Sequence, residues 1–305
     1  MKISISFLLL HLVLFASCSD EIIQEQNEDS IVIIEKSVNI LVYKDSSLTI
    51  ETYQDAYSKY MEMGLSHDSM GLKKEAPRYF IQNIAASNKK LTTKERKELF
   101  VSIILTNTLL VNEKMLVTRN KMMSILNQSN FSATDSLFLD SLTHITHIKN
   151  NDYTQLPIKY DIIPPSLVIA QAITESAWGT SHFAVEGNSL FGEHMPHSAK
   201  GKYIQASNSS VRLRAFKSIE GAVTEYIANL NRNNAYKGVR EARHSFRVKR
   251  EIFNGIQLAE REGHYSEMGN SYITTIKSII HSNNLHLFDD VVLRDMNSFF
   301  IYVVR

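Results

Sequence analysis

The segment from Pro165 to Gly179 constrains the fold more than any other part of the chain. Two prolines open it at positions 164 and 165, and most of the residues that follow are apolar or small. Proline is tolerated in the first helical turn and disfavours helix before it, while glycine favours a helix end, so the pattern predicts a buried helix closed near Gly179. The spacing of three and four puts Glu175 on one face with Val168, Gln171, Ala172 and Trp178.

Glu175 is the one acidic residue of this helix. Apolar neighbours disfavour the charged carboxylate and raise its pKa toward the range in which it can donate a proton near neutral pH. A glycosidase needs such an acid, and a buried structural glutamate bonded to backbone groups fits the same residues equally well. The helix by itself leaves both interpretations open.

Composition narrows the class of protein. The 305 residues are 44% hydrophobic and 21% charged, which excludes a wholly disordered chain, a coiled-coil rod and a multi-pass membrane protein. A net charge of +1 gives no electrostatic case for nucleic acid. The single cysteine excludes intramolecular disulfides and multi-cysteine metal sites. His194 and His197 flank a helix-breaking proline without a carboxylate cluster, so we expect no metal and no cofactor.

The amino terminus predicts export. An apolar run over residues 3–15 is too short to span a bilayer, which takes about 20 apolar residues, and predicts a signal peptide over residues 1–17. The small residues before Cys18 resemble a bacterial lipoprotein signal, in which this cysteine is lipidated. An uncleaved anchor is the alternative, and it too exports the chain. Residues 18–36 are expected to form an acidic tether, and the protein to be an outer-membrane lipoprotein facing the periplasm or the cell surface.

Residues 37–150 are predicted to be a mainly helical N-terminal region. β-rich runs lie at 31–34 and 40–43, and the helical pattern is taken to begin after them, near Ala76, and to continue to about Ala86. Thr92 and Glu95 have the spacing of a capping box that opens a helix reaching Leu110. Further helices are expected over about 112–126 and from Ser132 onward, and the clearest boundary lies at residues 150–157.

Two other segments carry weaker signals. The basic residues between 232 and 250 could attract the carboxylates of a cell wall, but a solvated helix face is the preferred interpretation. Residues 287–305 form an apolar tail, in which a strand pairing with the segment near Ile31 is expected.

Several motifs in order resemble one family. They are residues 173–179 (ITESAWG) with Ser181, Phe183 and Ala184, residues 187–192 (GNSLFG), residues 215–216, 222–223, 225–227, 229–231 and 235–236, and Tyr265-Ser266-Glu267 followed by Gly269 and Tyr272. The chain resembles the glucosaminidase domain of glycoside hydrolase family 73, in its Bax-like bacterial branch, over about 160–283. Residues 76–150 resemble the helical leader of Bax-like proteins.

The resemblance implies an α+β, mostly α fold: a lysozyme-like domain over residues 151–286, with a small β-hairpin lobe, preceded by a helical leader. It implies hydrolysis of the β-1,4 bond after N-acetylglucosamine in peptidoglycan, with glycan strands as the partner. Glu175 is then the general acid, and Tyr265 stabilises the reacting sugar or is a core tyrosine. The implied substrate-binding residues are Gln171, Trp178, Asn188, Phe191, Tyr226 and Tyr272, although Trp178 and Tyr272 suit packing better.

One departure from the family concerns the second carboxylate, which usually lies on a hairpin shortly before the position of Ala215. Residues 202–214 predict that hairpin but contain no Asp or Glu, and Arg212 stands where the acid is expected. Three accounts stay open: attack by the substrate's own 2-acetamido group, a base supplied by Glu193 or Glu186, or loss of hydrolysis in a glycan-binding lipoprotein. A lytic transglycosylase is the enzymatic rival, because it needs only one acid.

Overall fold

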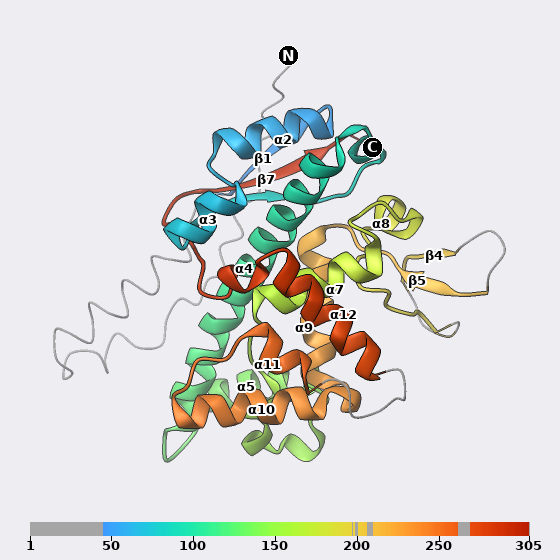
Figure 1. The fold of residues 1–305 in the computed structure, drawn as a ribbon. Coiled ribbons are helices and arrows are strands. Elements are labelled where there is room, and N and C mark those ends of the chain that lie inside the picture. The colour runs from blue at the N-terminus through green and yellow to red at the C-terminus, as the bar shows by residue number, and fades with distance from the viewer. Residues whose placement is uncertain (1–44, 197, 199–200, 206–209, 262–268, 305) are drawn as a thin grey trace.

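The computed structural model describes residues 45–196, 198, 201–205, 210–261 and 269–304. Helices build most of this part, and the strands form three small sheets (Figure 1). A small β-hairpin projects from the helical body, and helices α2 to α5 precede the helix that carries Glu175. This confirms the predicted fold class: α+β, mostly α, with a helical leader and a hairpin lobe.

The elements follow one another along the chain as helices separated by short strands. The α-helices are α2 (Tyr53–Glu62), α3 (His67–Lys73), α4 (Thr93–Leu126), α5 (Ala133–Ile145), α6 (Leu156–Lys159), α7 (Pro165–Ser176), α8 (His182–Gly187), α9 (Ile219–Arg232), α10 (Lys237–Lys249), α11 (Gly255–Ala259) and α12 (Gly269–Ser282). The strands are β1 (Asp45–Ile50), β2 (Glu75–Ala76), β3 (Tyr79–Ile81), β4 (Tyr203–Gln205), β5 (Arg212–Arg214), β6 (Val292–Leu293) and β7 (Ser298–Val303). Short 3₁₀ helices include η2 (Ala86–Lys90) and η7 (Leu285–Phe288).

Helix α4 is the central element of the core. The predicted capping box is present, since the Thr92 hydroxyl accepts from the backbone N–H of Glu95, and the Glu95 carboxylate accepts from that of Thr92. The sequence predicted two helices here, but one helix of 34 residues runs through the whole segment. It is long and apolar enough to cross a membrane, yet 72% of its most apolar stretch is buried among other elements, as in a core helix.

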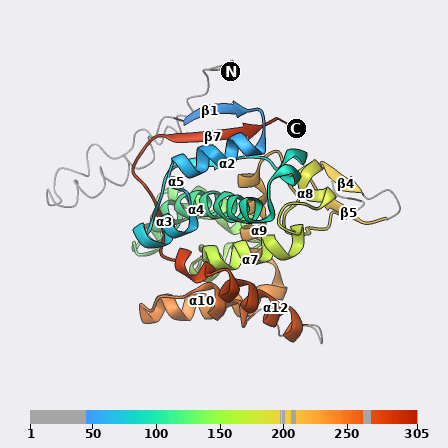
Figure 2. The same ribbon diagram turned by 45° about the horizontal axis from the view of Figure 1, so that its top comes forward.

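The three-stranded sheet joins distant parts of the chain, with β7 between β1 and β3 and both neighbours parallel to it. Figure 2 shows β7 beside β1, although the two strands come from opposite ends of the described chain. The predicted strand in the tail is therefore present. Its described partner is Asp45–Ile50, while the predicted partner near Ile31 lies outside the described residues. The helical prediction for 76–86 is wrong, because Tyr79–Ile81 forms strand β3. This strand pairs with β7 of the tail, and the local sequence does not reveal so distant a partner.

The helical leader and the later helices share one core. A single cluster of buried side chains contains Phe100 and Leu105 of α4, Leu167 of α7, Ile227 of α9 and Ile301 of β7. Helix α4 packs against both α7 and α9. Elements on both sides of residues 150–157 therefore contribute side chains to the same core.

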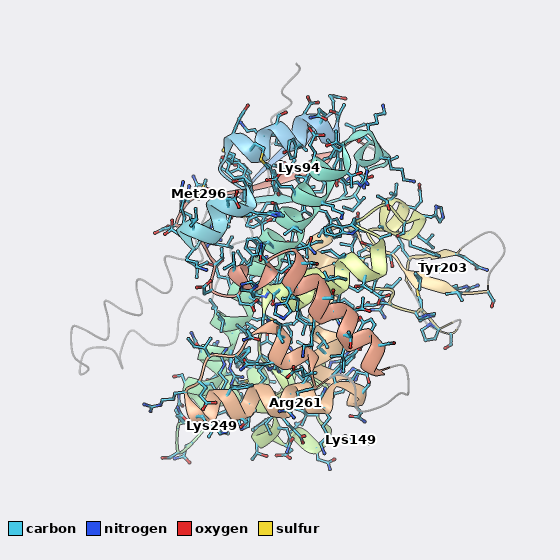
Figure 3. All side chains as sticks on the ribbon, viewed as in Figure 1. Lys94, Lys149, Tyr203, Lys249, Arg261 and Met296 are labelled. Atoms are coloured by element: carbon cyan, nitrogen blue, oxygen red, sulfur yellow. The ribbon has the colours of Figure 1, made fainter. Side chains whose placement is uncertain are left out.

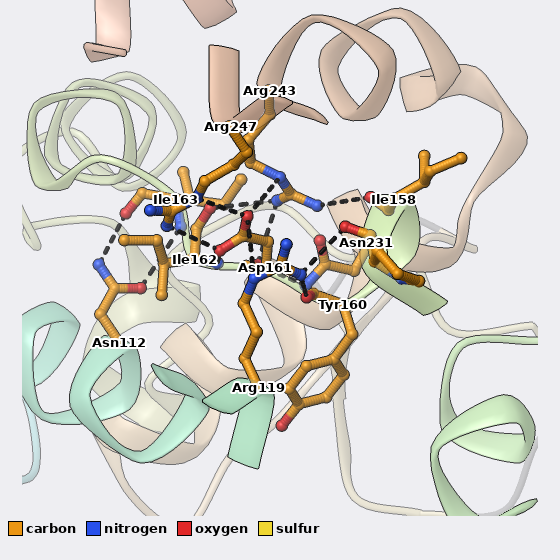
Figure 4. A network of polar contacts seen from close by, with 11 residues as sticks. Asn112, Arg119, Ile158, Tyr160, Asp161, Ile162, Ile163, Asn231, Arg243 and Arg247 are labelled. Carbon is orange, nitrogen blue, oxygen red and sulfur yellow. Dashed lines mark hydrogen bonds and ion pairs between the residues drawn. The ribbon is translucent and has the colours of Figure 1, made fainter. Parts of the chain in front are cut away.

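A buried ion network fastens α10 to this body (Figure 4). Asp161 is 1% exposed and lies within ion-pair distance of Arg119, Arg243 and Arg247. Arg243 is also 1% exposed, and its guanidinium donates to the backbone carbonyls of residues 158, 161 and 162. Burial acts to raise the pKa of Asp161, but the three arginines together hold it below its usual value.

The expected solvated basic face is thus wrong for the middle of this stretch. Arg240 and Arg243 are buried, and Arg247 pairs with Asp161. Arg243 and Arg247 contact groups from α6 and the loop before α7, which lie far from them in sequence. Arg240 instead donates to the nearby backbone carbonyls of residues 230 and 233.

Candidate functional site

Helix α7 is held at its N-terminus by a partly buried carboxylate from the tail. Asp289 accepts hydrogen bonds from the N–H and hydroxyl of Ser166, at 2.8 Å each, and from the N–H of Gly255 at 3.0 Å. These donors begin α7 and α11, where the helix dipoles favour negative charge. The tail therefore fixes the orientation of α7 and, with it, the position of the C-terminal end of this helix.

The C-terminal end of α7 exposes Glu175. The helix ends at Ser176, and Ala177, Trp178 and Gly179 all have left-handed backbone angles, with φ of 51°, 60° and 71°. A Cβ on Gly179 would lie 2.9 Å from the Phe100 ring, so glycine is required there. The helix is three residues shorter than predicted, and Trp178 does not share a helical face with Glu175.

The Glu175 carboxylate lies between α12 and the loop after α8. The Tyr272 hydroxyl donates a hydrogen bond of 3.3 Å to Oε1. On the other side, the Cβ that Gly192 lacks would stand 3.0 Å from Oε2. Among the described residues, no cation pairs with this carboxylate.

Glu175 is exposed, yet its pKa is raised. Neighbouring groups displace part of its water, which disfavours the charged form, and the hydrogen bond from Tyr272 opposes this effect by stabilising the carboxylate. The predicted direction of the shift agrees with this environment. The shielding is weaker than the apolar helix pattern implied, because the turn at 177–179 carries Trp178 away.

Glu193 follows Gly192 directly and is a second perturbed carboxylate. Its Oε1 is buried and has no hydrogen-bond partner among the described residues. Burial, together with the nearby charge of Glu225, raises its pKa to about 7, against the opposing effect of Arg214 and Arg232. A glutamate in this state exchanges a proton near neutral pH.

The predicted hairpin forms, with Tyr203 opposite Arg214 and Gln205 opposite Arg212. The Arg212 guanidinium lies 4.3 Å from the centre of the Tyr203 ring, a cation–π contact. Arg214 pairs with Glu225 of α9, which Arg232 also contacts. Arg212 and Arg214 therefore give the hairpin lobe positive charge, and the ion pair between Arg214 and Glu225 links the lobe to α9.

An aromatic pair supports the loop that carries Gly192 and Glu193. The Phe191 ring stacks on Tyr226 of α9, with centroids 4.2 Å apart and planes inclined by 14°. Tyr226 is buried and Phe191 is partly buried against the same core. This stacking fixes the residue that directly precedes Gly192 and Glu193.

Residues 150–285 match the model of a family described as Mannosyl-glycoprotein endo-beta-N-acetylglucosaminidase. This segment is a glucosaminidase-family domain. The resemblance to glycoside hydrolase family 73 is confirmed by this match, which contains Glu175, Gly192, Glu193 and Tyr272.

Two curated proteins are similar to the chain. Protein bax of Escherichia coli (strain K12) is 27% identical over 194 residues, which cover 62% of this chain and 70% of that protein. Exo-glucosaminidase LytG of Bacillus subtilis (strain 168) is 31% identical over 133 residues, 44% of each chain.

Two solved structures also match. The catalytic domain of the autolysin Auto from Listeria monocytogenes gives a TM-score of 0.33 at 17% identity, covering 56% of this chain and 96% of that one. The C-terminally truncated glycoside hydrolase domain of FlgJ from Salmonella typhimurium gives 0.31 at 21% identity, covering 49% and 97%.

The other predicted substrate-binding residues of the glucosaminidase domain differ in accessibility. Trp178 packs edge-to-face on Phe100, at 6.3 Å, with the Lys97 ammonium 4.6 Å from its ring centre. Asn188 is fully buried, accepts from the N–H of Ile84 and donates to the carbonyl of Phe216. Gln171 is 5% exposed within α7. Trp178 thus packs against Phe100, while the hydrogen bonds of Asn188 hold the loop after α8 against the core.

Glu186 lines a pocket that neither Glu175 nor Glu193 lines. It is exposed on α8 and lines a pocket with the base of the hairpin and strand β7, and Glu175 is not part of that lining. Tyr265 and Cys18 lie outside the described residues. No group of three or more metal-ligating side chains occurs within the described ranges.

Sequence reasoning treated Tyr272 mainly as packing and did not single out Gly192. The hydrogen bond from Tyr272 joins residues 97 positions apart, so no local signal could predict it. Gly192 belonged to a recognised motif, and its positive φ of 64° beside the carboxylate explains the glycine.

Proposed function

We propose that the chain hydrolyses β-1,4 glycosidic bonds after N-acetylglucosamine in peptidoglycan. The observation that carries this proposal is the setting of Glu175: a carboxyl group open to solvent, with a raised pKa, a tyrosine hydroxyl on one oxygen and no described cation beside it. The family match over residues 150–285 gives the class of reaction.

Glu175 acts as the general acid in this proposal. It holds a proton while the substrate binds and delivers it to the glycosidic oxygen as the bond to the anomeric carbon breaks. A bound sugar displaces more water from the exposed carboxyl group, which raises its pKa further and keeps it protonated until transfer. Tyr272 holds the carboxyl group in place and, by family analogy, Tyr265 stabilises the reacting sugar.

We assign the second carboxylate to Glu193. Consecutive Cα atoms are about 3.8 Å apart, so the Glu193 Cα lies within about 8 Å of Glu175 Oε2. In inverting glycosidases the base lies across the attacking water from the acid, so a carboxyl group on a neighbouring loop that does not touch the acid suits this role. Glu193 is supported as the base by its place directly after Gly192 and by a pKa raised to about 7, near the pH at which a base must exchange protons. Substrate-assisted attack by the 2-acetamido group is the alternative route and needs no second carboxylate.

The first experiment is digestion of purified peptidoglycan, followed by mass spectrometry of the products. Reducing N-acetylglucosamine ends are expected from the wild type, with a loss of at least about two orders of magnitude in Glu175→Gln. Glu251→Gln, at an exposed glutamate, is the matched control and is expected to retain full activity. Anhydromuramyl ends would indicate a lytic transglycosylase instead. Wall binding without cleavage, unchanged in Glu175→Gln, would indicate an inactive glycan-binding protein.

The second experiment separates the two routes of attack. With Glu193 as base, the product forms with inverted anomeric configuration, and Glu193→Gln loses about two orders of magnitude. Substrate assistance gives retention and leaves Glu193→Gln close to wild type. Proton NMR of the freshly released anomer distinguishes them.

We also propose that the protein is exported and anchored to the outer membrane through lipidated Cys18. The support is the signal pattern of residues 1–17 and the acidic tether after it. Metabolic labelling with a radioactive fatty acid is expected to mark the wild type and not Cys18→Ala. A Cys18→Ala variant that is labelled equally would remove this assignment.

A further inference from the structure

A pocket of about 410 Å³ lies outside the Glu175 site, at the junction of α8, the base of the hairpin and strand β7. Its wall includes Lys202 and Lys217 from either side of the hairpin, Glu186 from α8 and Tyr302 from β7. Pockets of this size hold small molecules or a few residues of a peptide. Nothing in the proposed hydrolytic chemistry uses it.

The pocket is held by contacts from all three walls. The Asn83 side chain exchanges two hydrogen bonds with the backbone of Val303, and Asn188 joins the backbone of Ile84 to that of Phe216. Gly187 has no room for a side chain, because a Cβ would lie 2.6 Å from the Ile204 side chain. The pocket is therefore a feature of the packed fold.

Its charges favour an anionic ligand that also carries a positive group. Lys202 and Lys217 are exposed, and neither forms an ion pair with any residue in the described ranges. Two such ammonium groups on one wall attract carboxylates. Glu186 on the α8 wall adds a negative charge, which disfavours polyanions such as nucleic acids and favours a ligand with an amino group beside its carboxylates.

The pocket lies within reach of a strand bound at Glu175. Gly187 lines the pocket and Gly192 lies against the Glu175 carboxylate, and the backbone between them spans at most about 18 Å even when extended. A peptide attached to the glycan can therefore occupy the pocket while the sugars occupy the catalytic site.

We propose that this pocket binds the stem peptide of peptidoglycan, with Lys202 and Lys217 on its carboxylates, Glu186 on its amino group, and Phe216 and Tyr302 as walls. This assignment rests on the proposed function, because it takes the substrate to be peptidoglycan. It makes the enzyme selective for glycan strands that still carry their peptides.

The test compares two substrates made from one wall preparation: glycan strands with stem peptides, and the same strands after an amidase has removed them. In the double variant Lys202→Ala/Lys217→Ala, the ratio of kcat/KM on peptide-bearing strands to that on peptide-free strands is expected to fall at least about tenfold. The control is Lys237→Ala/Lys249→Ala on α10, which removes the same charge. Figure 3 shows Lys249 far from the hairpin residue Tyr203, and the control ratio is expected not to change.

Direct binding makes the result independent of catalysis. Isothermal titration of the full chain with the released stem peptide is expected to show saturable binding, weakened about tenfold or more in the lysine variant, with circular dichroism checking that it folds. Glu186→Gln, a second variant, is expected to lose discrimination between the free peptide and the same peptide with its amino group acetylated. An unchanged ratio together with unchanged peptide binding in the lysine variant overturns the proposal. If the wild type cleaves neither substrate, the hydrolytic function fails, while the titration still decides the pocket.

Discussion

The Tyr272 hydroxyl donates to Oε1 of Glu175, so a residue near the start of α12 controls the protonation of a carboxyl group at the end of α7. The bond stabilises the ionised form and thereby lowers a pKa that desolvation raises. The two helices contact each other along their packed faces. The pKa of Glu175 thus depends on the packing of α12 against α7 as well as on the loss of water around the carboxyl group.

Removing this hydroxyl is expected to move the pH dependence of the enzyme. In Tyr272→Phe the pKa of Glu175 rises further, and since the general acid must be protonated, the alkaline limb of the pH–rate profile moves to higher pH. The maximal rate is expected to stay within about tenfold of wild type, because the acid itself is retained. The profile of Tyr153→Phe, whose hydroxyl bonds Asp140 elsewhere, should coincide with that of wild type. A Tyr272→Phe limb that moves to lower pH would contradict this account.

A methyl group at position 192 is expected to disturb the acid more than the fold. Gly192→Ala places a Cβ about 3 Å from Glu175 Oε2 and requires an alanine at a φ of 64°. We expect kcat to fall at least about tenfold, since small misplacements of catalytic groups are costly, with a loss of about 1–2 kcal/mol in unfolding free energy. Gly71→Ala in α3, where the added Cβ makes only ordinary contacts, is the control. Full activity in Gly192→Ala would show that this contact does not position Glu175.

Glu193 is expected to make the protein less stable as the pH rises. Its folded pKa of about 7 lies above the ordinary glutamate value of 4.5, so the folded state binds more protons between these limits and stability falls across that window as the pH increases. Glu193→Gln removes the buried charge and should gain about 1–3 kcal/mol over wild type at pH 8, with little difference at pH 4. Urea unfolding at both pH values measures this. A gain of equal size at pH 4 would assign it to something other than ionisation.

Neutralising Asp161 is expected to destabilise the whole body. Asp161→Asn leaves Arg119, Arg243 and Arg247 without their shared counter-charge in a buried setting, and breaking a buried pair in this way costs about 3–5 kcal/mol. Urea unfolding at pH 7 gives the value. Asp68→Asn, at an exposed aspartate in the first turn of α3, should cost less than about 1 kcal/mol. Equal losses in the two variants would mean that the network contributes no more than a surface charge.

Local signals predicted the elements that depend on local chemistry. The capping boxes at Thr92 and Ser132 mark the starts of α4 and α5, the proline at 165 marks the start of α7, and alternation in residues 202–214 predicted the hairpin. These features are set by neighbours a few residues away. The fold class and the family followed from motifs that lie in order along one segment.

Features that depend on distant partners could not be predicted in the same way. The segment at 79–81 is a strand only because β7 pairs with it, and Arg243 is buried only because Asp161 and three carbonyls surround it. Trp178 left the predicted helical face because Gly179 and Phe100 force a left-handed turn. For the proposed site, the sequence named Glu175 as the general acid and Glu193 among the candidates for a second carboxylate, and the structure supplied the surroundings of both side chains.

The position of β7 has a consequence for how the protein is made. This strand lies between β1 and β3, and it follows every other element along the chain. The central strand of the sheet is therefore synthesised after both edge strands. The pocket between α8, the hairpin and β7 is completed at the same time, because Tyr302 of β7 lines it. Folding of this sheet must therefore wait until residues 298–303 have left the ribosome, so β1 and β3 remain without their shared partner for most of translation.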